Sequence, residues 1–131
     1  MSENSASDLL KSMSYVISQS LRPHLSHAAV VEKYKRGLAA AKALVEELDR
    51  EHSSADMRKR AKELVNLFTD ALGIVEKIKK EYDNSLKNLA LSAGKELSRA
   101  IDDFGVEYKH DVNKRLTARI RRVARVLSAR Q

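Results

Sequence analysis

The sequence ADMRKRAKELVNLFTDALGIVEKIKKEY, residues 55–82, decides the fold. Its apolar residues recur in alternating steps of four and three: Met57, Ala61, Leu64, Phe68, Ala71, Val75, Ile78 and Tyr82. This spacing places them on one face of an α-helix, and it is the most regular heptad pattern in the chain. Ser53 and Asp56, three residues apart, resemble a helix-capping pair at its start. We therefore predict one long amphipathic helix over residues 55–82.

Similar patterns on either side of this stretch predict three further helices. The first covers residues 6–21 and ends before Pro23, which lacks a backbone donor and restricts the residue before it. The second covers residues 27–51 and carries a coiled-coil-like apolar seam. Its connection to the next helix, residues 52–54, is short, which predicts an antiparallel pair. The fourth helix is expected over residues 86–107, after a polar turn.

The composition favours helix throughout, because the 131 residues include one proline and four glycines and no run typical of a strand. We predict an all-α fold in which residues 1–108 form a three- to four-helix antiparallel bundle with coiled-coil-like heptads. The fourth helix has no clear stop before residue 130, and about 45 helical residues would span roughly 67 Å. It therefore bends at Gly94 or Gly105, or protrudes beyond the bundle.

The positive charge of the chain is concentrated at its C-terminal end. The net charge is +7, and residues 1–108 hold 17 of the 25 Lys and Arg and 17 of the 18 Asp and Glu, so that part is formally neutral. Residues 109–131, which we call the basic arm, contain Asp111 as their one acid. The cations of the basic arm are Lys109, Lys114, Arg115, Arg119, Arg121, Arg122, Arg125 and Arg130.

The basic arm has the pattern of an amphipathic helix with an apolar stripe under a broad cationic face. The stripe consists of Val112, Leu116, Ile120, Val123 and Leu127. A solvated face of a bundle helix is one interpretation, but such faces usually mix charges of both signs. Like charges four residues apart, such as Arg121 and Arg125, destabilise a helix slightly when no counter-ion is near. The arm is therefore expected to bind an anionic surface.

Nucleic-acid phosphate is the first candidate for that surface, because several cations on one face give salt-dependent binding with little base readout. The alternative is an acidic protein surface, as in a scaffolding, adaptor or virion-type protein. That surface could belong to another copy of the chain, so a homo-oligomer or a larger complex is expected. A membrane surface is less expected, because the stripe lacks Trp and Phe. The candidate self-assembly patch is the acidic cluster Glu46, Glu47, Asp49 and Glu51.

Motifs for metal binding and catalysis are weak in this sequence. Glu107 and His110 have the Glu-x-x-His spacing of di-metal bundles, and Asp49 with His52 is a loose copy of it. His24 and His27, three residues apart just after Pro23, are a further possible ligand pair. A di-metal site needs further carboxylates on the inward face of residues 55–82, and that face is apolar. Phosphate-loop, nucleophile-elbow and zinc-protease motifs are absent. We predict a protein that is not an enzyme and has no metal, cofactor or small-molecule substrate.

The absence of cysteine excludes disulfides and thiolate chemistry but leaves the redox compartment undetermined. Two other observations bear on where the protein is found. Residues 1–7 are polar and unlike a secretory signal, and no apolar run approaches the roughly 20 residues that span a bilayer. We expect a soluble intracellular protein of the cytoplasm or nucleoid, or one within a virus particle.

Overall fold

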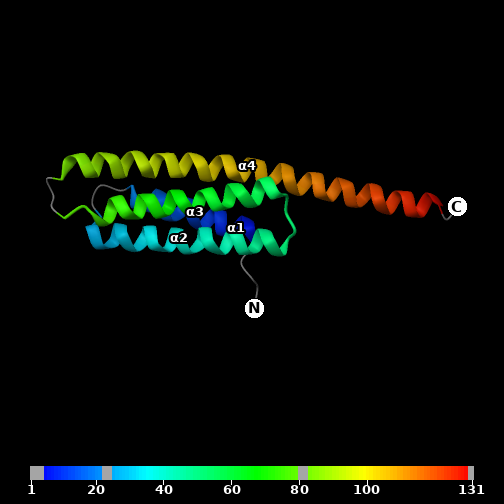
Figure 1. Ribbon diagram of the computed structural model, residues 1–131, viewed down its shortest axis with the longest axis horizontal. Coiled ribbons are helices and arrows are strands. Elements are labelled where there is room, and N and C mark those ends of the chain that lie inside the picture. Colours follow the sequence, from blue (N-terminus) through cyan, green and yellow to red (C-terminus); the bar gives the residue numbers. More distant parts are fainter. Residues whose placement is uncertain (1–4, 22–24, 80–82, 130–131) are drawn as a thin grey trace.

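The computed structural model describes residues 5–21, 25–79 and 83–129, and these residues contain four α-helices and no strand. The helices are α1 (Ala6–Ser20), α2 (His27–Arg50), α3 (Ala55–Glu76) and α4 (Asn84–Ala129). They lie lengthwise side by side, and the chain reverses direction at each connection (Figure 1). The predicted all-α helical bundle is therefore confirmed.

The four helices form a closed ring around one core. Within the described residues, α1 packs on α2, α2 on α3, α3 on α4, and α4 returns to α1. Each helix buries its apolar face toward the centre of this ring. The six heptad residues of α3 from Met57 to Val75 are all buried, and Phe68 at the middle is fully enclosed. Burial of the four larger side chains of this face, Met57, Leu64, Phe68 and Val75, contributes about 1.5 to 3 kcal/mol each, so the face stabilises the bundle.

Gly37 allows α2 to approach α3 closely. A Cβ atom at this position would overlap the ring of Phe68, so the absence of a side chain makes room for the largest group in the core. Alanine would be a better helix former here by roughly 1 kcal/mol. The glycine therefore serves packing between the two helices rather than chain flexibility.

The predicted end of the third helix is wrong for residues 77–79. α3 ends at Glu76, and the backbone N–H of Lys79 donates a 2.9 Å hydrogen bond to the carboxylate of Asp83. This bond takes the amide away from the helical ladder, so the chain turns although the apolar pattern continues. The predicted helical residues 80–82 lie outside the described residues. α4 begins at Asn84, two residues before the predicted start, since the Asp83 carbonyl accepts from the N–H of Lys87.

The start of α3 is capped by Ser54 and not by Ser53. The hydroxyl of Ser54 accepts a hydrogen bond from the backbone N–H of Met57 at 3.2 Å, which satisfies one free amide of the first turn. Ser53 is buried instead, and its hydroxyl donates to the carbonyl of Leu48 at 3.0 Å. Ser53 therefore bonds to the last turn of α2, and Ser54 caps the first turn of α3.

α4 is one uninterrupted helix of 46 residues. Gly94 and Gly105 both lie inside it, so neither ends the helix. At about 1.5 Å per residue it is roughly 69 Å long, whereas the 22 residues of α3 span roughly 33 Å. Its last part, drawn from orange to red, continues past the loop that joins α2 to α3 (Figure 1). None of the helices in the described residues is long and apolar enough to cross a membrane.

Candidate nucleic-acid interface

The basic arm contains the most exposed apolar surface of α4. Leu97, Ile101 and Phe104 in the preceding turns are 1–3% exposed because α1 and α3 cover them. From Leu116 onward the apolar residues of the stripe are 52–59% exposed. The helix therefore keeps its amphipathic pattern after its neighbours have ended, and the stripe has no covering element within the described residues.

The arm is fastened to the bundle at one junction, formed by Glu51, Tyr108, Asp111 and Arg115. The Tyr108 hydroxyl donates a 2.8 Å hydrogen bond to Glu51 Oε1. Arg115 Nη2 lies 3.3 Å from the same carboxylate, and Arg115 Nη1 donates to the Glu51 backbone carbonyl at 3.3 Å. Arg115 Nε is held at 3.0 Å by Asp111. These contacts tie α4 to the C-terminal end of α2 just before the stripe becomes exposed.

The junction shifts the pKa of two of its groups. Burial, and then the hydrogen bond and charge of Glu51, raise the pKa of Tyr108 to about 12, so its hydroxyl keeps its proton and donates. Burial lowers the pKa of Arg115, but the bonds and charges of Glu51 and Asp111 outweigh that effect and raise it. Arg115 therefore stays charged and is engaged within its own chain, which sets it apart from the other cations of the arm.

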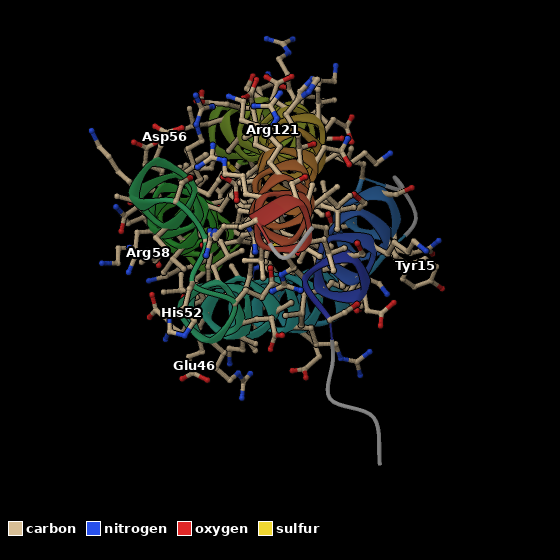
Figure 2. The ribbon with its side chains drawn as sticks, turned by 90° about the vertical axis from the view of Figure 1, so that its right-hand side faces the viewer. Tyr15, Glu46, His52, Asp56, Arg58 and Arg121 are labelled. Carbon is tan, nitrogen blue, oxygen red and sulfur yellow. The ribbon has the colours of Figure 1, made fainter. Side chains whose placement is uncertain are left out.

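The remaining cations of the arm within the described ranges are exposed. None of them forms an ion pair with an acid in the part of the chain that the structure describes, while Arg130 lies outside that part. Figure 2 looks along the arm toward the bundle and shows Arg121 on the α4 side, across the molecule from Glu46 and His52. The exposed cations are Lys109, Lys114, Arg119, Arg121, Arg122 and Arg125.

Three of the exposed cations lie on the side of the arm opposite the apolar stripe. At about 100° per residue, Lys114, Arg121 and Arg125 fall within roughly 40° of one another. They point about 140° to 180° away from the centre of the stripe, which lies near Leu116. One partner could therefore contact the cations while another covers the stripe.

The acidic cluster at the end of α2 is already largely paired. Three of its members form ion pairs inside the chain: Glu47 with Arg50 at 2.8 Å, Asp49 with Arg58 at 3.9 Å, and Glu51 with Arg115 at 3.3 Å. Glu46 is exposed and has no ion pair within the described ranges. Another copy of the arm would have to displace these partners to bind here.

The histidine-containing pairs do not converge on a common centre. Within the described residues no group of three or more His, Asp or Glu side chains is placed to hold a metal ion. Glu107 and His110 are both exposed on α4, and Asp49 and His52 are exposed at the end of α2. Of the remaining pair, His24 lies outside the described residues, and His27 Nε2 donates to the Val75 carbonyl at 2.8 Å.

Sequence reasoning missed the junction. Glu51 and Arg115 are 64 residues apart, and Tyr108 reads as one more apolar position of the fourth helix. The available signal was the position of Arg115, which falls seven residues after Tyr108 on the side that faces the bundle. Comparison of the chain with protein-family models, curated proteins and solved structures gives no significant match.

Proposed function

We propose that this is a non-enzymatic helical binding protein whose basic arm docks on nucleic-acid phosphate with little base specificity. One observation carries the proposal: six cations of α4 are exposed beyond or beside the end of the bundle and have no acid partner in the described residues. Such a partner would place the protein where nucleic acid is found, in the cytoplasm, the nucleoid or a virus particle.

The size and chemistry of the arm suit a phosphate backbone. Residues 109–129 span roughly 32 Å as a helix, and duplex DNA carries one charge per about 1.7 Å of its axis. The duplex therefore offers more phosphates than the arm has cations. Arg119, Arg121, Arg122 and Arg125 can each give two parallel hydrogen bonds to a phosphate group. The same residues offer little that would distinguish one base pair from another.

The alternative partner is an acidic protein surface, in the manner of a scaffolding or adaptor protein. The acidic cluster of a second copy is a poor candidate, because Arg50, Arg58 and Arg115 already occupy most of its carboxylates. An acidic surface on a different protein would need a fixed pattern of carboxylates to match the arm. A phosphate backbone supplies a continuous row of charges without such matching, which favours nucleic acid.

The test is binding to random-sequence duplex DNA and RNA of equal length across a salt series. For the unchanged chain we expect the affinity to fall steeply as salt rises, because bound counter-ions are released from the duplex. Replacement of the four arginines 119, 121, 122 and 125 by Ala removes four contacts and should reduce the slope of log affinity against log salt by about 3 to 4.

The matched control removes the same charge from the bundle, by replacement of four exposed lysines with Ala: Lys35, Lys42, Lys59 and Lys62. This control should leave most of the slope in place. Equal losses in both variants would mean that the whole protein is merely cationic and would overturn the proposal. Absence of binding to either duplex near physiological salt would also overturn it and would favour an acidic protein partner.

A further inference from the structure

The exposed stripe of the arm has the spacing of a coiled-coil seam. Leu116, Ile120, Val123 and Leu127 follow one another in steps of four, three and four, and each is more than half exposed. Side chains at this spacing interlock with the same pattern on a second helix. Water is a poor environment for four large apolar side chains in a continuous row, so the stripe is expected to be covered in the working assembly.

The stripe continues a line of α4 that runs beside α1 nearer the bundle. Leu116 lies seven residues beyond Lys109, and Ile120 lies fourteen beyond Val106, so these residues share heptad positions. Lys109 and Val106 border a shallow groove against Leu10 and neighbouring residues of α1. α1 starts at Ala6 and runs antiparallel to α4 (Figure 1). α1 therefore borders this line of α4 as far as about Lys109, with Val106 still 56% exposed, and within the described residues no helix borders it further on.

The charges beside the stripe identify what fits there. The positions that flank Leu116, Ile120, Val123 and Leu127 are Thr117, Ala124 and Val126, which are uncharged, and Arg119, which is the one cation among them. An anionic bilayer would bind cations that flank the stripe, but Arg121 and Arg125 point to the opposite side of the helix and would face away from the lipid. An identical arm can approach this seam with uncharged residues at most of the flanking positions, and Lys114, Arg121 and Arg125 of each copy then stay on the outside.

We infer that the stripe is covered by the arm of a second copy, packed antiparallel. A parallel partner would bring its own bundle against α1, which already lies beside this line of α4. In the antiparallel arrangement Leu116 faces Leu127 of the other copy, and Ile120 faces Val123. The second arm then runs in the same direction as α1 and ends near its N-terminus, where the ends of the two helix dipoles attract. The two bundles lie at opposite ends of the dimer.

Dimerisation through the stripe does not depend on nucleic-acid binding. The two interactions are expected to respond to salt in opposite directions. The arms carry the same charge, so the dimer should tighten as salt screens their repulsion. Phosphate binding should weaken under the same conditions. A dimer that tightens with salt supports the inference whether or not the duplex experiment succeeds.

Sedimentation equilibrium of the full chain, at several protein and salt concentrations, is the first experiment. The unchanged protein should show a monomer–dimer equilibrium. Ile120→Asp places a carboxylate in the centre of the seam and should weaken the dimer by about 100-fold. Leu89→Asp makes the same charge change at an exposed leucine of α4 outside the stripe and should leave the dimer intact.

Cysteine pairing tests the orientation, because the natural chain has no cysteine. A mixture of Leu116→Cys and Leu127→Cys chains should form a disulfide-linked heterodimer under mild oxidation. Leu116→Cys alone should give little linked dimer, since residue 116 of one copy is far from residue 116 of the other. Efficient linking of Leu116→Cys with itself would overturn the antiparallel arrangement.

Three further results would overturn the inference. The first is a monomer at every concentration and salt level. The second is a dimer that survives Ile120→Asp. Flotation of the full chain with anionic vesicles, if it depends on Ile120, would show that lipid covers the stripe and would overturn the dimer in the same way.

Discussion

The first half of α4 buries Leu97, Ile101 and Phe104, whereas the second half of the same helix leaves Leu116 and Ile120 more than half exposed. Both halves have apolar residues at helical spacing, so the difference does not come from the pattern. It comes from the lengths of the neighbours, because α2 ends at Arg50 and α3 begins at Ala55 beside the junction. Amphipathic spacing thus predicts a helix with a face, but a neighbouring element must be present before that face contributes to stability.

Substitution of one isoleucine in each half of α4 tests this difference most directly. Ile101→Ala leaves a cavity in the core and should lower the free energy of unfolding by about 2 to 5 kcal/mol. Ile120→Ala changes an exposed site and should stay within about 0.5 kcal/mol of the unchanged chain. Urea unfolding at protein concentrations low enough to keep the chain monomeric measures both. A large loss for Ile120→Ala under these conditions would mean that the arm is covered within its own chain.

Gly37→Ala tests the packing of the buried core, where α2 contacts α3. The new methyl group would overlap the Phe68 ring, and overpacking of this kind costs about 1 to 3 kcal/mol. The double variant with Phe68→Leu should recover part of the loss made by the glycine change, since the smaller side chain vacates the space. Thermal unfolding of the four chains of this cycle measures the coupling. Purely additive effects would contradict the close contact of α2 with α3.

Gly105→Ala should raise the free energy of unfolding, whereas Gly37→Ala lowers it. A Cβ atom at Gly105 meets no other atom within 4 Å, so the methyl group adds no clash. Alanine is the better helix former, and the variant should gain about 0.5 to 1 kcal/mol. The same urea experiment measures it. A loss instead of a gain would indicate that α1 lies closer to this turn than the structure places it.

The helices of the fold could be predicted because their signals are local. The proline after the first helix and the apolar spacing of α3 each act within a few residues, and the helices begin at residues 6, 27 and 55 as expected, although Ser54 and not Ser53 caps α3. The end of α3 could not be predicted in this way. The apolar pattern runs on through Ile78, but the bond from the Lys79 amide to Asp83 competes with the helix, and its strength cannot be read from spacing.

In the candidate site, too, local features could be predicted from the sequence and contacts between distant residues could not. Charge counting finds the cations of the arm, since the count needs no structure. It cannot tell that Arg115 is held by Glu51 while Arg121 is unpaired in the described residues, because that depends on which turn of α4 lies beside the end of α2. It also grouped Glu51 with a free acidic patch, whereas most of that patch is paired in place.

Substitution at the junction gives the smallest expected change in the free energy of unfolding, and the junction also makes stability depend on pH. Glu51→Gln removes the charge that Arg115 and Tyr108 share and should lower the free energy of unfolding by about 0.2 to 1 kcal/mol near neutral pH, because the groups are only partly buried. Tyr108 has a pKa of about 12 in the folded chain against an ordinary value of 10.0. Between these values the unfolded chain has lost the proton that the folded chain retains, so stability falls as pH rises through this window.

In Glu51→Gln the pKa of Tyr108 should fall toward its ordinary value, although burial, the larger cause, still keeps it raised. An absorbance titration of the tyrosines follows the change, and the difference between the unchanged chain and Tyr108→Phe assigns the late-titrating group. Tyr34 needs this assignment too, because burial also raises its pKa. If Glu51→Gln left the titration of Tyr108 unchanged, the hydrogen bond across the junction would be absent in solution. α4 would then separate from the bundle at a turn before Tyr108.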